Sequence, residues 1–291
     1  MQAFDYLAPR SLDEAYSHLG NGKSTLFLAG GTDVIVQLRE GRKHCDQLID
    51  LKHIPELVAH GFASDGTLEI GAAAPLAEIY ENPEVASRLP GLIDAAALIG
   101  GIQIQSRASL GGNLCNASPA ADSTPALIAL GARLLIGSKS GTREIPVEEF
   151  FTGPGRSTLA ANEILLQVRI PAQPARSGAF YLRFIPRNEM DIAVVSAGAR
   201  LVLSDGGDTI ESARIALGAV GPTVIAATAA ADSLAGKPAT DTSIQAAGEL
   251  ASQVATPITD MRGSIAQRRK LASVLTVRAL HGALTRAREN R

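Results

Sequence analysis

The chain has 291 residues, of which 46% are hydrophobic and 19% are charged, so it can bury a substantial core and intrinsic disorder is excluded. Its 27 basic and 29 acidic side chains leave a net charge of −2, which gives no general attraction to nucleic acid or to an anionic membrane. The N-terminal segment MQAFDYLAPR lacks the apolar run of a signal peptide, and no stretch of about 18 apolar residues predicts a membrane span.

The first half of the chain carries alternating helix and strand signals. A Ser-Leu-Asp-Glu capping box begins the first helix, which Gly20 ends, and Pro75 begins a later one. In chain order we predict helix 12–19, strand 25–28, helix 34–39, strand 47–51, strand 67–70, helix 92–99, strand 102–105, a glycine turn at 109–113, a helix capped by Asp122 that ends at Gly131, and strand 133–136. The alternation at the start of the chain is an α/β pattern.

The composition changes around the Pro-Ala-Gln-Pro segment at residues 171–174. Three long strands are predicted after it, at 179–185, 192–203 and 210–220, separated by turn-rich pieces. Helices then dominate, and the last runs from about residue 264. We therefore predict a domain boundary near residue 175 and a C-terminal domain of α+β type, with a sheet followed by helices.

The first candidate ligand-binding segment is Ala29-Gly30-Gly31-Thr32-Asp33, between a predicted strand and a predicted helix. Two adjacent glycines let the backbone turn tightly and approach a ligand closely. The N–H groups at the start of the helix form a positive nest that suits a pyrophosphate, and the hydroxyl of Thr32 adds a further donor. The alternative is an ordinary strand-to-helix turn that uses glycine only for its geometry.

A second glycine pair occurs in Ser109-Leu110-Gly111-Gly112-Asn113, which leads on to Asp122. Two such segments are able to close on one diphosphate from both sides. A Rossmann site would instead have the pattern G-x-G-x-x-G with an acidic residue about 20 residues later, and neither segment has it. The two segments together predict a dinucleotide site of another type.

Other landmarks accompany these segments along nearly the whole chain. They are residues 27–33, 70–72, 109–122, 150–155, 163–166, 190–193 and the Arg268-Arg269 pair. The segment SLGGNLCNASPAAD at 109–122 is the most specific, because its length and order are hard to reach by chance. On these residues the chain resembles the FAD-binding medium subunits of molybdenum hydroxylases, the relatives of xanthine dehydrogenase, carbon monoxide dehydrogenase and bacterial aldehyde or aromatic hydroxylases.

The resemblance implies an α+β fold: a two-part FAD-binding domain of the vanillyl-alcohol-oxidase type at 1–175, with subdomains at about 1–55 and 56–175, and a smaller domain at 176–291. FAD would lie extended between the two subdomains. The residues that the resemblance assigns to the pyrophosphate are Ala29, Gly30, Gly31, Thr32, Asp33, Ser109, Gly111, Gly112 and Asn113. Asp122 matches a position on the adenosine side, and Leu165 matches an apolar residue near the adenine or flavin edge. Arg183 matches a basic residue, often lysine in relatives, close to the isoalloxazine, where it would help to set the flavin potential.

The resemblance also implies partners. In such complexes a large subunit holds the molybdenum cofactor, and a small subunit holds two [2Fe–2S] clusters that pass electrons to the FAD and on to an external acceptor. A cytoplasmic flavin subunit of this kind is the leading hypothesis. The rivals are a free-standing FAD-dependent oxidase or dehydrogenase of the same fold, and a nucleotide-binding assembly or regulatory protein without redox chemistry.

Some chemically reactive residues have plainer interpretations. The two cysteines, Cys45 and Cys115, do not indicate a disulfide framework, and an iron–sulfur cluster needs about four ligands. Cys115 is predicted to be a small buried packing residue. His44, His53 and His60 lack metal-motif spacing, so no metal site is predicted. The segment Arg268-Arg269-Lys270 is predicted to be a solvated helix face, with a partner contact as the alternative.

Overall fold

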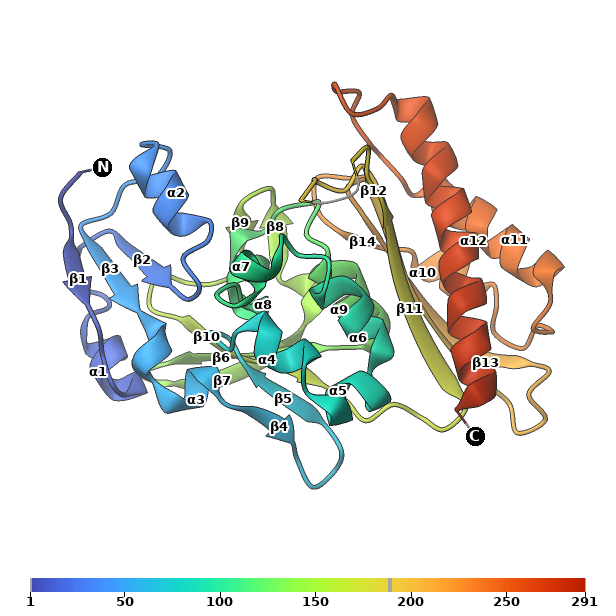
Figure 1. The fold of residues 1–291 in the computed structure, drawn as a ribbon, viewed down its shortest axis with the longest axis horizontal. Coiled ribbons are helices and arrows are strands. Elements are labelled where there is room, and N and C mark those ends of the chain that lie inside the picture. Colours follow the sequence, from blue (N-terminus) through green and yellow to red (C-terminus); the bar gives the residue numbers. More distant parts are fainter. Residues whose placement is uncertain (1, 188–189, 291) are drawn as a thin grey trace.

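The computed structural model describes residues 2–187 and 190–290, which form three main sheets and a short two-stranded ribbon (Figure 1). The first sheet is parallel and has the order β1-β3-β2, from β1 (Asp5–Leu7), β2 (Thr25–Leu28) and β3 (Gln47–Asp50). The connections that parallel strands require are made by α1 (Leu12–Ser17) and α2 (Val34–Arg39). Ser11 caps α1 as predicted, since its side chain accepts a hydrogen bond from the backbone N–H of Glu14, while the Glu14 carboxylate accepts from the N–H of Arg10 in place of that of Ser11.

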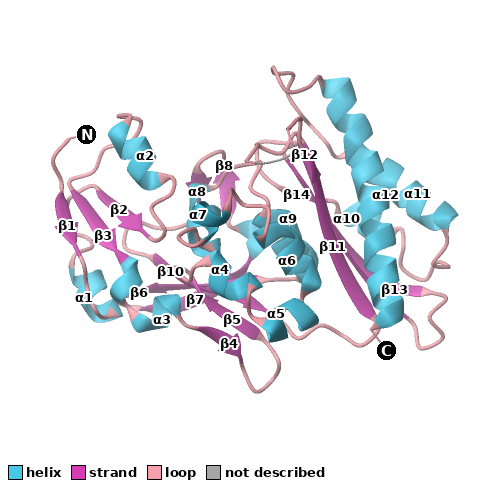
Figure 2. Cartoon of the chain, viewed as in Figure 1, coloured by secondary structure: helices cyan, strands magenta, loops and turns pink. Residues whose placement is uncertain are grey.

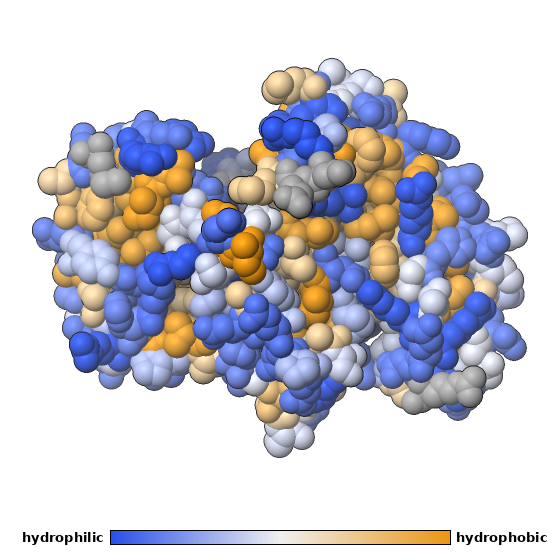
Figure 3. Space-filling view, in the orientation of Figure 1, coloured by the Kyte–Doolittle hydropathy of each residue, from blue (hydrophilic) through white to orange (hydrophobic). Residues whose placement is uncertain are grey.

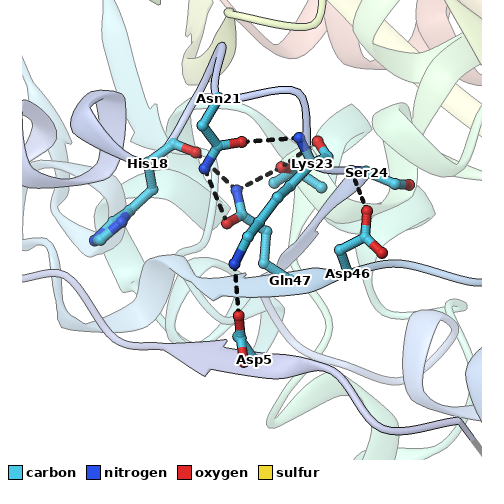
Figure 4. Close-up of polar contacts among 8 residues, drawn as sticks. Asp5, His18, Asn21, Lys23, Ser24, Asp46 and Gln47 are labelled. Carbon is cyan, nitrogen blue, oxygen red and sulfur yellow. Dashed lines mark hydrogen bonds and ion pairs between the residues drawn. The ribbon is translucent and has the colours of Figure 1, made fainter.

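A polar network fixes the start of β2 (Figure 4). The buried Gln47 of β3 donates through Nε2 to the carbonyl oxygen of His18 and to the hydroxyl of Thr25, both at 2.7 Å. The backbone N–H of Ser24 donates to Asp46 at 2.7 Å. The loop before β2 is thereby pinned to β3, which sets the direction in which β2 delivers the first glycine segment.

The second sheet is antiparallel and has the order β4-β5-β10-β6-β7. Its strands are β4 (His60–Phe62), β5 (Leu68–Gly71), β6 (Arg133–Ser138), β7 (Gly141–Pro146) and β10 (Ile164–Ile170). The short elements around it are η1 (Leu51–His53), α3 (Pro55–Val58), η2 (Val147–Glu149) and the ribbon β8 (Phe151–Gly153) with β9 (Arg156–Ser157). Between β5 and β6 run α4 (Leu76–Tyr80), α5 (Pro83–Arg88), α6 (Pro90–Ala96), α7 (Ile102–Gln105), α8 (Leu110–Asn116) and α9 (Ser123–Leu130). Their apolar side chains cover the sheet and form the largest core of this half.

The third sheet has the order β11-β12-β13-β14 and is buried on both faces. Its strands are β11 (Ser177–Phe184), β12 (Val195–Leu203), β13 (Ile210–Gly218) and β14 (Ile225–Ala226), followed by α10 (Thr228–Asp232), α11 (Asp241–Gln253) and α12 (Ile265–Glu289). Helix α12 lies across one face, whereas α6 and α9 of the preceding half pack on the other (Figure 1). Although α12 has 25 residues, neither it nor any other helix in the described part of the chain is long and apolar enough to cross a membrane.

The predicted strand at 102–105 is wrong, because these residues form the helix α7. Gly100 has a φ of +65°, and the N–H groups of Ile104 and Gln105 then both donate to the carbonyl oxygen of Gly101. The side chain of Gln105 is buried and donates to the carbonyl oxygen of Ala97 at 2.9 Å, whereas Ile102 is 58% exposed. The apolar alternation that suggested a strand therefore does not mark a buried face.

The predicted glycine turn at 109–113 is also wrong, because this segment begins the helix α8. Ser109 is its N-cap, and its hydroxyl accepts a hydrogen bond from the N–H of Gly112 at 3.0 Å. Glycine is a poor helix former, so the pair suggested a turn. Here Gly111 serves packing instead: a Cβ on it would overlap the backbone of Ala72.

The predicted solvated face at residues 268–270 holds for Arg269 and Lys270 but not for Arg268. The Arg268 side chain is buried and donates to the carbonyl oxygens of Val194 at 2.8 Å and Ala219 at 3.1 Å, and to Asp260 at 2.7 Å. Arg268 therefore ties the start of α12 to the third sheet. This burial could not be predicted, because a row of three basic residues does not reveal which one points inward.

Candidate functional site

A cavity of about 410 Å³ lies where the parallel sheet meets α7, α8 and the start of β10. Its volume falls in the range typical of small-molecule sites. Helices α7 and α8 stand between the first and the third sheet in the view of Figure 2. Polar lining comes from residues 29–33 and 109–116, and apolar lining includes Phe27, Ile104 and Leu165. The structure thus brings both predicted glycine segments, and the predicted Leu165, to one cavity.

The first glycine segment is shaped by two different requirements. Gly30 packs so closely on the 107–108 segment that a Cβ on it would overlap the carbonyl oxygen of Arg107. Gly31 has a φ of +78°, the left-handed region that favours glycine. The next residues, Thr32 and Asp33, lead directly into α2, for which Asp33 is the N-cap without a side-chain capping bond. The strand, glycine pair and helix therefore follow one another as the sequence predicts.

The second segment presents Gly112 to the cavity. A Cβ on Gly112 would lie 3.1 Å from the Ser109 hydroxyl and 3.8 Å from the Cβ of Ala29, so the two glycine segments adjoin at this point of the cavity wall. Asn113 accepts a hydrogen bond from the hydroxyl of Ser123 at 2.6 Å, which fixes its side chain against the start of α9. Because Gly112 has no Cβ, a ligand in the cavity is able to approach the backbone at this position.

Side-chain amides join the two segments directly. The amide of Asn116 donates to the carboxylate of Asp33 at 2.9 Å and accepts from the amide of Gln37 at 3.2 Å. All three residues line the cavity. Neither Gln37 nor the clasp, as we call the Asp33–Asn116 hydrogen bond, was predicted from the sequence, because residues 33 and 116 are brought together only by the tertiary fold.

Cys115 lines the cavity and is exposed, so its prediction as a buried packing residue is wrong. The reason is helical phase: Leu110, Gly111 and Leu114 take the buried positions of α8 and leave Cys115 on the cavity side. Desolvation by the cavity walls raises the pKa of the Cys115 thiol to about 12, and the ammonium group of Lys43 opposes this shift. The thiol is therefore protonated near neutral pH, which does not suit a redox or nucleophilic role. Within the described residues, no group of three or more candidate metal ligands occurs.

Asp122 and Arg183 lie outside the lining of this cavity and contact each other. The Arg183 guanidinium pairs with one carboxylate oxygen of Asp122, and the hydroxyl of Tyr181 donates to the other at 2.5 Å. Asp122 does not cap α9 through its side chain, contrary to the prediction, because both oxygens face β11. Burial raises the pKa of Asp122, and Arg183 and Tyr181 oppose the rise.

The contact between these two residues corrects one sequence-based expectation. The resemblance placed Asp122 on the adenosine side of FAD and Arg183 at the isoalloxazine, which are opposite ends of an extended dinucleotide. Side chains in direct contact cannot serve opposite ends of one extended dinucleotide, so these two roles are incompatible with each other. The ion pair is buried, because only 6% of the Arg183 side chain and 10% of the Asp122 side chain are exposed.

Comparison with known proteins defines the class. Residues 2–173 match the family model described as the FAD binding domain in molybdopterin dehydrogenase, and residues 180–283 match the CO dehydrogenase flavoprotein C-terminal domain. The chain belongs to this family of FAD-binding subunits of molybdenum hydroxylases, and FAD is its cofactor. The α+β fold, the family and the oxidoreductase class predicted from the sequence are confirmed.

Particular relatives match almost end to end. The chain is 33% identical over 285 residues to the carbon monoxide dehydrogenase medium chain of Hydrogenophaga pseudoflava, covering 97% of this chain and 98% of the relative. It is 31% identical over 283 residues to the putative xanthine dehydrogenase FAD-binding subunit XdhB of Escherichia coli K12, covering 97% and 96%. Among solved structures, carbon monoxide dehydrogenase from Hydrogenophaga pseudoflava superposes with a TM-score of 0.93, 32% identity and 98% coverage of both chains.

Proposed function

We propose that this chain is the electron-transfer subunit of a cytoplasmic molybdenum hydroxylase complex. It takes electrons from the [2Fe–2S] clusters of a small partner subunit and passes them to an external acceptor, while a large partner subunit holds the molybdenum cofactor. The observation that carries this proposal is the match over 96–98% of relatives that are themselves named as a FAD-binding subunit and a medium chain. The free thiols of Cys45 and Cys115 support a reducing compartment.

In this proposal the cavity between the glycine segments holds the FAD. Bound FAD supplies the two-electron redox chemistry, and the chain binds and orients it and tunes its electronics. Residues at the starts of α2 and α8 would hold the pyrophosphate through backbone N–H groups, and Leu165 would supply apolar contact to a ring. The cofactor-binding residues that we assign are Ala29, Gly30, Gly31, Thr32, Asp33, Ser109, Gly111, Gly112, Asn113 and Leu165, with Asp122 and Arg183 as a pair at one end. Gly30 and Gly111 act by allowing the close backbone packing that forms the cradle.

An exposed apolar surface also fits a subunit with this role. Exposed apolar side chains occur on the α6–α7 and β11–β12 connections, at Leu98, Ile102, Met190 and Ile192. This surface is next to the cavity: Gly101 lies beside Met190, and Ile104, three residues further on, lines the cavity. Apolar residues are also visible in the middle of the face shown in Figure 3. Such a surface next to a redox cofactor suits docking of a partner subunit.

The domain division in this proposal is 1–175 for FAD binding, with subdomains at about 1–55 and 56–175, and 176–291 for the C-terminal domain. One hydrophobic cluster has all its fully buried members after residue 193, which supports a separate C-terminal core. The N-terminal sheet has a small cluster of its own, and a further cluster joins it to β10.

The isolated, FAD-loaded chain tests the subunit role. We expect it to take up electrons from an artificial donor such as dithionite, because the flavin is reducible without partners. We expect no turnover of aldehydes or purines, because substrate chemistry belongs to another subunit. Flavin absorbance and product formation are measured under the same conditions. Robust turnover by this chain alone would contradict the subunit role and favour a free-standing oxidase.

A further inference from the structure

The turn after α2 directs a lysine to the FAD cavity. Gly41 has a φ of +70°, and the N–H groups of Arg42 and Lys43 both donate to the carbonyl oxygen of Gln37, at 2.9 and 3.2 Å. These bonds end the helix and fold the chain back beside it. Lys43 lines the cavity as a result, together with Gln37 itself.

The cavity has few charged side chains. Among its lining residues within the described part of the chain, Asp33 and Lys43 are the charged ones. The Asp33 carboxylate is held by the amide of Asn116, while the neighbouring Arg42 pairs with Glu40 at 2.6 Å. A diphosphate brings about two negative charges, so without Lys43 the cavity would present only a like-charged side chain to it.

The position of Lys43 relative to the second glycine segment follows from α8. Cys115 is three residues after Gly112, so both lie on one face of this helix. The ammonium group of Lys43 is close enough to the Cys115 thiol to influence it electrostatically. Lys43, Gly112 and Cys115 all line the same cavity.

We propose that Lys43 is the cationic partner of the FAD diphosphate. This inference rests on the FAD site proposed above and adds a residue that the glycine segments do not supply, since these offer only N–H dipoles. Lysine binds phosphate as a compact point charge, and a flexible stem lets it follow the ligand. The sequence did not single out Lys43, because no motif surrounds it.

FAD titration of the apo-protein, followed by flavin fluorescence, tests the role of Lys43. We expect Lys43→Met to weaken FAD binding about 10-fold, equivalent to about 1.4 kcal/mol, and Lys43→Arg to retain most of the affinity. Arg42→Met is the matched control. It removes the same charge from the neighbouring residue, which does not line the cavity, so its FAD affinity should equal that of the parent. Raising the salt concentration should weaken FAD binding more in the parent than in Lys43→Met, because salt screens a charge pair that only the parent has.

Competition separates a phosphate contact from a general defect. ADP should compete with FAD about 10-fold less well in Lys43→Met, whereas adenosine should compete equally in both proteins. An equal loss for adenosine, or unchanged FAD affinity in Lys43→Met, would overturn the proposal for Lys43. Failure of the FAD site itself is recognised separately, because Gly112→Val would then also keep full FAD affinity.

Discussion

Gly112→Val is expected to abolish FAD binding in a chain that still folds. Gly112 faces the cavity, and its Cβ would meet only the Ser109 hydroxyl at 3.1 Å and Ala29 at 3.8 Å, so the apo-protein has room for the new side chain. The valine would instead fill the space through which a ligand reaches the backbone. We expect a loss of FAD affinity of about 100-fold or more, measured by titration, with apo-protein stability changed by less than about 1 kcal/mol, because valine has a somewhat better helix propensity than glycine.

Gly111→Val is the contrasting variant, because Gly111 packs against the protein backbone whereas the adjacent Gly112 faces the cavity. A Cβ on Gly111 would overlap the backbone of Ala72, which cannot move aside as a flexible side chain can. We expect the free energy of unfolding of the Gly111→Val apo-protein to fall by about 1–3 kcal/mol or more, as at other overpacked sites. Full FAD occupancy in Gly112→Val would contradict the assignment of the second segment to the cofactor.

Arg183→Met is expected to destabilise the protein strongly, by about 3–5 kcal/mol at neutral pH, because it leaves the buried Asp122 carboxylate without its cation. Asp122→Asn combined with Arg183→Met should recover about 1–3 kcal/mol of that loss, since the uncompensated charge is gone. Urea denaturation of the parent, the single variants and the double variant measures this coupling. Arg133→Met, which breaks a half-exposed pair with Glu144, is the control and should cost at most about 1 kcal/mol.

The pH dependence of Arg183→Met has a defined sign. Burial already raises the folded-state pKa of Asp122 above its usual value, and loss of Arg183 removes one of the groups that oppose the rise. A group whose folded pKa is raised favours the folded state below its unfolded pKa and loses that contribution as the pH increases through the folded pKa. The stability deficit of Arg183→Met relative to the parent should therefore shrink on acidification. A deficit that does not change with pH, or no recovery in the double variant, would contradict a buried charge pair.

The same variant reports on the flavin. If the Asp122–Arg183 pair lies at the isoalloxazine end, the uncompensated carboxylate disfavours the more negative reduced flavin. The two-electron potential of Arg183→Met should then fall by tens of millivolts with FAD still bound, since about 30 mV corresponds to 1.4 kcal/mol. An unchanged potential at full FAD occupancy would assign the pair a structural role alone.

Local signals in the sequence predicted the first half of the site well. The strand 25–28, the helix 34–39 and the glycines between them appear in the structure as predicted, because a buried β run, a glycine pair and a helical run are each local. The second segment was misjudged as a turn, since helix propensity argues against a Gly-Gly pair in α8. There the tertiary contact of Gly111 with Ala72 outweighs propensity.

Long-range contacts account for what the sequence could not predict. The clasp between Asp33 and Asn116, the pair between Asp122 and Arg183, and the inward turn of Arg268 each join residues that are distant along the chain or on different elements. A single sequence contains no periodicity that records such contacts. The resemblance supplied the positions of Asp122 and Arg183 but not the fact that they touch.

Release of the cofactor tests the central claim, noncovalent FAD in the cavity between the two glycine segments, most directly. The purified protein is precipitated with acid, and the flavin in the supernatant is identified and counted against protein. We predict free FAD at one molecule per chain, because the cavity binds it through backbone groups, apolar packing and Lys43 without a covalent link. Flavin that stays in the pellet, or FMN in the supernatant, would contradict this account.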